Sequence, residues 1–282
     1  MFFLLSDIVF TKTGNKSIIQ GNNACYSSVC ARDNNRQHGD CARRSKSEKV
    51  GKEMKTTKSV EPWGDPNTAT ILVIGHDPRL LKSSAVAKHA FFMEYLDREP
   101  PNDSPSRAKF DLARAIPEYV DWLVHRKRPQ ELLYVTNLCC TYLDRTRETR
   151  GTILIPDSEA SVGVDAIKQA VTKGHFKLIL PMSAQVFYHL CRLRFTDEDA
   201  ETRRQFEDSA RPNAKKAQQG IYVPVKPAPF LEVCGMKFHH QGIPVIPILH
   251  VKNWRKEEIQ IEKYKQPMEN ARKEVHAIAI LD

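Results

Sequence analysis

Four short apolar runs, separated by longer segments with helical patterning, limit the folds that this chain can adopt. The runs lie at residues 70–75, 131–139, 175–181 and 242–250. A short apolar run between turn residues is typical of a buried strand. Strands that alternate with helices imply right-handed crossovers and a parallel sheet covered on both faces. The sequence therefore predicts an α/β fold.

The segments between the runs carry apolar residues at the spacing of helices. Ser83 and Ser84 can cap the first helix, and Pro117 is expected to kink or restart the second. The polar stretch from Thr196 to Gly220 predicts a loop or an insertion instead. Helices are expected at residues 85–96, 106–128, 157–173 and 183–195, and over part of 253–274.

Residues 13–66 differ from the rest of the chain because they are polar and show no sustained period. Between Gly21 and Val60 there are nine Lys or Arg against four Asp or Glu. Such a composition cannot bury enough apolar surface to offset the entropy lost on ordering. We therefore expect a basic, disordered tail over residues 1–66 and one folded domain over residues 67–282.

The cysteines and histidines do not predict a metal site. The tail holds four residues of metal-ligand type, but their spacing matches none of the common zinc patterns. The adjacent pair His239 and His240 is not convincing as a metal pair either. The cysteines of the domain are expected to be small buried hydrophobes. The tail residues are Cys25, Cys30, His38 and Cys41, and the domain cysteines are Cys139, Cys140, Cys191 and Cys234.

The composition indicates a soluble protein with an anionic partner. Hydrophobic residues make up 41% of the chain, which is ordinary for a domain with a core, and the net charge is +9. A basic balance favours nucleic acid, although a soluble protein with a basic tail gives the same count. No apolar stretch is long enough to cross a bilayer, and the first ten residues lack a basic leader. We expect an intracellular monomer without membrane contact and with reduced cysteines.

Polar residues stand where three of the apolar runs end. His76 and Asp77 follow the first run, Asn137 ends the second and His250 ends the last. The carboxyl ends of parallel strands lie at one edge of the sheet, so residues far apart in sequence converge there. The sequence also places Phe91 close after the first of these strands.

An aspartate, an amide, a histidine and an aromatic ring suit the recognition of a planar heterocycle. An aromatic face stacks on a base, and an Asn side chain both donates to and accepts from its edge. His250 can donate to an oxygen that gains negative charge as a bond breaks. Asp77 can orient a water molecule or offset positive charge on a sugar.

These residues stand in motifs that resemble the uracil-DNA glycosylase superfamily. "VIGHDP" and "KHAFF" are similar to the Gly-Gln-Asp-Pro-Tyr and Ala-Phe-Ser motifs of the family-1 enzymes. "LYVTNLCCTYL" is similar to the strand that carries the uracil-reading Asn. "LILPMSAQVFYHL" resembles the third strand with its helix, and "PILHVKNW" the strand that ends in the catalytic His. The four motifs occur in family order over most of residues 70–254.

The resemblance implies a three-layer α/β/α sandwich with a four-stranded parallel sheet. It also implies hydrolysis of the N-glycosidic bond of a flipped-out deoxyuridine in DNA, without a cofactor. In that reading Asp77 positions the water, Phe91 stacks on uracil, and Gly75 and His76 are further substrate-binding residues. Asn137 reads the uracil edge, and His250 stabilises charge on the departing O2. DNA contacts are expected after His250, at Lys252, Trp254 and Arg255.

The chain departs from the family pattern at three places that bear on function. The family Gln is His76 here, and the Tyr that excludes the thymine methyl group is Arg79. The Pro-Ser after the catalytic His is Val251-Lys252, so the loop that pinches the DNA backbone is altered. Trp254 is either a wedge into DNA or a residue that packs against a helix.

Two other functions stay open from the sequence. The altered loop also fits a nucleic-acid-binding module of the same fold without catalysis. An unrelated α/β enzyme acting on a phosphorylated small molecule is a third reading, but neither Gly-rich phosphate-binding pattern occurs in the chain. Taken singly, Asp77 before Pro78 is also a turn former, Asn137 a strand cap, and His250 a buried structural histidine.

Overall fold

The computed structural model describes residues 59–76, 87–125, 130–141, 152–223, 225, 227–251 and 262–278. The chain divides into two units, Met1–Glu53 and Met54–Asp282, and all described residues belong to the second. Several expectations therefore lie outside the described residues. They concern the tail with its four candidate metal ligands, and the site residues Asp77, Arg79, Lys252, Trp254 and Arg255.

A five-stranded sheet forms the centre of the domain, in the order β2-β1-β4-β7-β6. Four neighbouring strands run parallel, and β6 pairs antiparallel with β7 at the edge. The strands are β1 (Ile71–Gly75), β2 (Leu133–Asn137), β4 (Leu178–Pro181), β6 (Phe238–His240) and β7 (Ile243–Val245). The α/β fold is confirmed. The described sheet is mostly parallel and has five strands where four parallel strands were expected, the fifth being the antiparallel β6.

The central strands are apolar because both faces of the sheet are covered. All five residues of β1 and all four of β4 are buried. A strand that is covered on both sides has no solvent face, so its sequence is a continuous apolar run rather than an alternating one. This explains why residues 71–75 and 178–181 carry no charged side chain.

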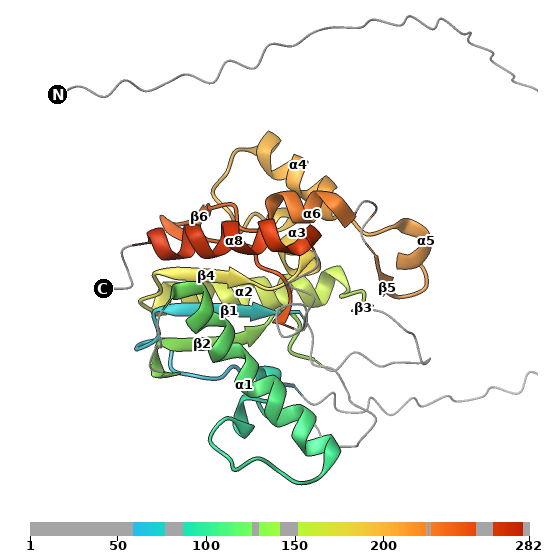
Figure 1. The fold of residues 1–282 in the computed structure, drawn as a ribbon. Coiled ribbons are helices and arrows are strands. Elements are labelled where there is room, and N and C mark those ends of the chain that lie inside the picture. Colours follow the sequence, from blue (N-terminus) through green and yellow to red (C-terminus); the bar gives the residue numbers. More distant parts are fainter. Residues whose placement is uncertain are drawn as a thin grey trace, which may run out of the picture. The chain divides into compact units, whose positions relative to one another are not determined.

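Helices lie on both faces of the sheet, as the order of the strands requires. α1 (Ser104–Val124) connects β1 to β2, and α2 (Asp157–Lys173) connects β2 to β4 on the other side of β1. Because these two crossovers move in opposite directions along the sheet, the right-handed rule puts α1 and α2 on opposite faces. Figure 1 shows α1 crossing in front of the strands, with α8 (Glu262–Ala277) on the same side.

The contact between α1 and α8 joins the end of the chain to the sheet. The Tyr119 hydroxyl is buried and donates to the Leu249 carbonyl at 3.2 Å, and it also lies 3.2 Å from the Met268 sulfur. The Arg272 guanidinium lies over the Trp122 ring at 4.9 Å. These contacts link α1, α8 and the segment just before His250.

The prediction of a helix at residues 85–96 is wrong. The described part of this stretch is a short 3-10 element, η1 (Ala90–Tyr95), in which Phe91 and Phe92 have left-handed φ angles of 54° and 60°. Left-handed φ is unfavourable for large side chains, so tertiary contacts must hold it. The next helix begins at Ser104, where Asp103 caps it, and continues through Pro117 to Val124 as one helix.

The prediction of a loop from Thr196 to Gly220 is also wrong, because two helices form there. They are α4 (Ala200–Ala210), capped by Asp199, and α5 (Ala214–Ala217), capped by Asn213. α4 packs through Phe206 against Phe187 and Phe238. α3 (Ala184–Arg192) begins close to its expected start, and α6 (Pro227–Val233) and the small sheet of β3 (Thr152–Ile153) and β5 (Ile221–Tyr222) were not expected.

A strand-like segment at residues 59–63, which the sequence analysis assigned to the tail, pairs with the domain. We call it the N-terminal arm. The Val60 amide donates to the Cys140 carbonyl at 2.7 Å, and Trp63 exchanges two backbone hydrogen bonds of 2.8 Å with Val135. Val60 is buried. The folded part of the chain therefore includes residues before 67.

Candidate functional site

The ends of β1 and β2 are joined closely at the carboxyl edge of the sheet. Gly75 and Asn137 are partners in the parallel register. Beyond the strands, the Leu138 amide donates to the Gly75 carbonyl and the Cys139 amide to the His76 carbonyl, each at 2.8 Å. Because this backbone pairing continues past both strands, Asn137 has a fixed position beside Gly75.

Gly75 is required because two other side chains cover its Cα. A Cβ at this position would collide with Cε2 and Cζ of the Phe91 ring and would lie 2.6 Å from Asn137 Oδ1. The Phe91 ring and the Asn137 amide therefore come together over Gly75. The absence of a side chain at Gly75 is what permits this approach.

The unusual backbone of η1 is what brings Phe91 to this position. Phe92 is buried in the core, whereas Phe91 remains partly exposed. The Glu94 carboxylate accepts hydrogen bonds from the amides of Lys88 and His89, at 2.9 and 3.1 Å. The N-terminal arm also holds η1 in place. The Glu61 amide donates to the Lys88 carbonyl, and the Glu61 carbonyl accepts from the Ala90 amide.

His250 reaches the same place from the far side of β4. The segment after β7 continues parallel to β4 through the bridge between Ile248 and Met182. The His250 ring centroid lies 5.7 Å from that of His76 and 6.2 Å from that of Phe91. His76 and Asn137 are buried, and His250 is partly exposed. The edge thus combines two imidazoles, one phenyl ring and one amide.

Five of the nine residues expected at the site are brought together by the structure. They come from four separate parts of the chain and are Gly75, His76, Phe91, Asn137 and His250. The other four, Asp77, Lys252, Trp254 and Arg255, lie outside the described residues. Asp77 directly follows His76 in the chain.

Cys140, which was expected to be a small buried hydrophobe, is only partly buried and makes a polar contact at this edge. Its thiol donates to the Asn137 carbonyl at 3.4 Å, and burial raises the pKa of that thiol. A raised pKa keeps the thiol protonated, so it remains a hydrogen-bond donor rather than a nucleophile. The position of Cys140, three residues after the strand-ending Asn137, was the available signal. Cys139 is fully buried, as expected.

Ser183 was also missed, although it follows β4 at the same edge. Its φ is 106°, its amide donates to the Ile248 carbonyl at 3.0 Å, and its Oγ is buried without a hydrogen-bond partner among the described residues. The hydrogen bond joins the end of β4 to the segment that leads to His250. A serine directly after an apolar run was the signal for it.

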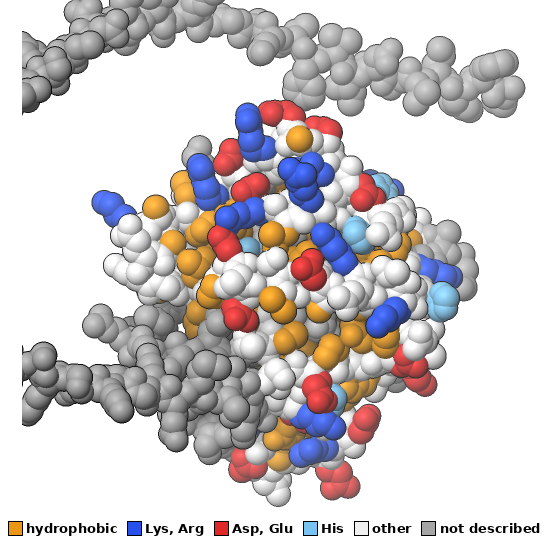
Figure 2. Space-filling view, turned by 180° about the vertical axis from the view of Figure 1, so that it is seen from behind, with side chains coloured by type: hydrophobic (Ala, Val, Ile, Leu, Met, Phe, Trp, Pro, Cys, Tyr) orange, Lys and Arg blue, Asp and Glu red, His pale blue; other side chains and the backbone are white. Residues whose placement is uncertain are grey.

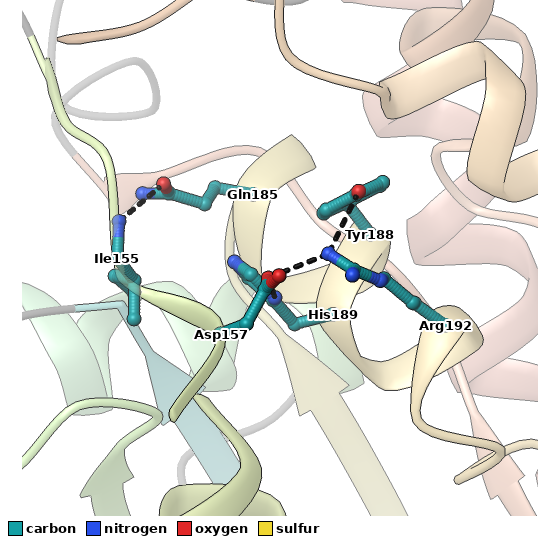
Figure 3. Close-up of polar contacts among 6 residues, drawn as sticks. All are labelled: Ile155, Asp157, Gln185, Tyr188, His189 and Arg192. Atoms are coloured by element: carbon teal, nitrogen blue, oxygen red, sulfur yellow. Dashed lines mark hydrogen bonds and ion pairs between the residues drawn. The ribbon is translucent and has the colours of Figure 1, made fainter. Parts of the chain in front are cut away.

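A second polar cluster holds the segment that leads into α2. The Gln185 side chain lies in α3, where its Oε1 accepts from the Ile155 amide and its Nε2 donates to the Ile153 carbonyl, both at 2.9 Å. Figure 3 shows the Gln185 amide directed at Ile155. Because Gln185 is buried and both ends of its amide are satisfied, it fixes the spacing between α3 and this segment.

The first residue of α2 completes this cluster. Arg192 donates to Asp157 Oδ1 at 2.5 Å and to the Tyr188 hydroxyl at 3.3 Å, as Figure 3 shows. His189 is 1% exposed, and its Nδ1 lies 4.0 Å from Asp157 Oδ1. Burial lowers the pKa of His189 to about 4, and the nearby Asp157 opposes that shift only in part. The imidazole is therefore neutral at pH 7.

No group of three or more His, Cys, Asp or Glu residues in the described ranges is arranged to hold a metal ion. Among the same residues, no helix is both long and apolar enough for a membrane span. On the face shown in Figure 2, Lys and Arg side chains are interspersed with Asp and Glu over the surface.

No protein-family model matches the chain, and no curated protein matches it.

Proposed function

We propose that this protein is a DNA glycosylase that hydrolyses the N-glycosidic bond of uracil or a related deaminated base. The observation that carries the proposal is the meeting of Phe91, Asn137 and His250 around the side-chain-free Gly75. These are the residues that the resemblance to uracil-DNA glycosylases selects. They are spread over 176 positions of the chain, from Gly75 to His250.

Each of these groups has a task in base excision. A glycosylase must take the target base out of the stack, which costs a few kcal/mol and is cheapest for mismatched or single-stranded bases. In the proposed site the partly exposed Phe91 ring stacks on the flipped base. The Asn137 amide donates to one polar atom of its edge and accepts from the next. His250 donates to the oxygen that gains charge as the base departs.

The nucleophile in this proposal is a water molecule, and Asp77 is its partner. Asp77 follows His76, whose carbonyl is fixed by the Cys139 amide. A carboxylate there would orient the water and offset the positive charge that develops on the sugar. No cofactor is needed for this hydrolysis. The sheet with helices on both faces supports the proposed three-layer sandwich of the glycosylase superfamily.

The proposal is tested by a glycosylase assay with the full chain. Single- and double-stranded oligonucleotides that carry one uracil are incubated with the wild type or with Asp77→Asn, and abasic sites are then cleaved with alkali. We expect cleavage by the wild type and a loss of about 100-fold or more in the variant, with DNA binding retained. If the wild type binds DNA but releases neither uracil nor, from matched oligonucleotides, hypoxanthine or xanthine, the protein is a binding module instead.

A further inference from the structure

The candidate site contains a second imidazole for which the resemblance provides no role. His76 is 4% exposed, and its ring centroid lies 5.7 Å from that of His250, with the ring planes at 50°. The His250 ring also faces Phe91, at 6.2 Å and 39°. The two imidazoles and the phenyl ring therefore form one cluster at the edge of the sheet.

A backbone hydrogen bond to the segment after β2 holds His76 in place. Its carbonyl accepts from the Cys139 amide at 2.8 Å, next to the bond between Leu138 and Gly75. The segment before His250 is anchored as well, because the Leu249 carbonyl accepts from the Tyr119 hydroxyl. Groups that are held in place before the substrate arrives act on developing charge without reorganisation cost.

We infer that His76 and His250 form a two-imidazole acid that protonates the departing base. This inference rests on the proposed glycosylase function and extends its substrates to deaminated purines, with hypoxanthine as the probe. An imidazolium ring can donate a proton from either nitrogen, so either ring of the pair can supply the proton to a base bound against it.

The chemistry balances as an acid-assisted hydrolysis. The bond between C1′ and N9 of the deoxyinosine breaks, and its electron pair stays with the base. The imidazole pair transfers its proton to N7, so hypoxanthine leaves as a neutral molecule. Water adds to C1′, and the proton that it loses returns to the imidazole pair. Uracil can leave as an anion held by a hydrogen bond, whereas a purine leaving group gains more from protonation.

The test compares hypoxanthine and uracil in matched single-stranded oligonucleotides under single-turnover conditions. The proteins are the wild type, His76→Gln, and the control His175→Gln, which removes an exposed histidine before β4. We expect His76→Gln to slow the release of hypoxanthine by about 100-fold, in the range of general-acid effects, and by at least about tenfold more than the release of uracil. His175→Gln is expected to match the wild type on both bases.

A second measurement does not depend on the folding of any variant. The wild type is given 7-deazahypoxanthine, which has no N7 to protonate, and we expect its release to be about 100-fold slower than that of hypoxanthine. Equal rates for the two bases would overturn the inference. So would release of uracil without hypoxanthine, or an equal loss on both bases in His76→Gln, and each of these leaves the glycosylase proposal standing. If the wild type releases neither base, both fail.

Discussion

Gly75 shows how one residue can define the candidate site. It is the point where the Phe91 ring and the Asn137 amide converge, and its own backbone carbonyl fixes the residue after Asn137. Its φ is not in the left-handed region, so the need for glycine comes from space and not from backbone strain. A larger residue would separate the two groups that the proposed function uses together.

Gly75→Ala is therefore expected to impair base excision more than folding. The added methyl group must displace Phe91 or Asn137, and overpacking of this kind costs about 1–3 kcal/mol of stability. We expect excision of uracil to fall by about 100-fold or more, since small displacements of positioning groups have effects of this size. Single-turnover rates and denaturant unfolding measure the two effects.

The matched control is Gly220→Ala. Gly220 has a φ of 70° and nothing within 4 Å of its Cβ position, so alanine there strains the backbone without touching the site. Full activity in this control and in Gly75→Ala alike would contradict the role given to Gly75.

His189 links the polar cluster of α3 to the pH dependence of stability. Its pKa is about 4 in the folded chain and near 6.5 in the unfolded chain. The unfolded state therefore binds more protons between these values, and stability is lost as the pH falls from about 6.5 to about 4. The pKa difference corresponds to about 3 kcal/mol, all of it present above pH 6.5.

A variant without the imidazole isolates this effect. The free energy of unfolding is measured by denaturant titration at pH 7 and at pH 4. Between these two pH values we expect it to fall by about 3 kcal/mol less in His189→Leu than in the wild type. The exposed His175→Leu serves as the control for removal of a histidine. Parallel pH profiles for the wild type and His189→Leu would show that His189 is not the source.

Among the elements, the N-terminal arm connects the two parts of the chain that carry Phe91 and Asn137. It bonds to Lys88 and Ala90 on one side and to Val135 and Cys140 on the other. The His89 ring adds a contact of 3.0 Å between its Nδ1 and the Pro62 carbonyl oxygen. The arm therefore holds η1 against the end of β2.

Two truncated chains separate the effect of the N-terminal arm from the effect of residues 1–58. A chain that begins at residue 59 keeps the arm, and we expect it to excise uracil as the full chain does. A chain that begins at residue 67 loses the backbone bonds of the arm and the buried Val60, which together stabilise by about 3–5 kcal/mol. We expect it to be less stable and to lose excision. Equal stability and activity of the two chains would show that the arm positions nothing.

The elements also show what the sequence can and cannot predict. β1, β2 and β4 were predictable because a strand covered on both faces is a short apolar run, and Asn137 was correctly placed at its end. The conformation of Phe91 could not be predicted, because the left-handed turn depends on Glu94 and on the N-terminal arm, which is distant in sequence. α4 was missed because its polar sequence has little apolar patterning, and Phe206 supplies its aromatic contacts with Phe187 and Phe238.

Across the whole molecule, positive charge is distributed unevenly along the chain. Residues 1–58 contain 11 Lys or Arg against five Asp or Glu, which accounts for six of the nine net positive charges. The remaining residues are close to balanced, which fits the mixed charges visible in Figure 2. The attraction to phosphates that the proposed function requires is therefore expected to come largely from the N-terminal 58 residues.

Deletion of residues 1–58 tests whether these residues supply most of the attraction to phosphates. Each phosphate contact steepens the fall of affinity with salt, so we expect the slope of log K against log salt to decrease in magnitude by at least about 2. Fluorescence anisotropy with a labelled oligonucleotide at several salt concentrations measures the slope. The excision rate at saturating protein should stay within about threefold of the full chain. An unchanged slope would mean that the folded domain makes the phosphate contacts.

The measurement that tests the central claim most directly is the release of uracil and of cytosine by the full chain and by Asn137→Asp. The amide of Asn137 can both donate and accept, whereas a carboxylate only accepts, which suits the amino group of cytosine. We predict that the wild type releases uracil and not cytosine, and that Asn137→Asp loses this preference. Release of neither base by the wild type, or an unaltered preference for uracil in the variant, would contradict the account of this site.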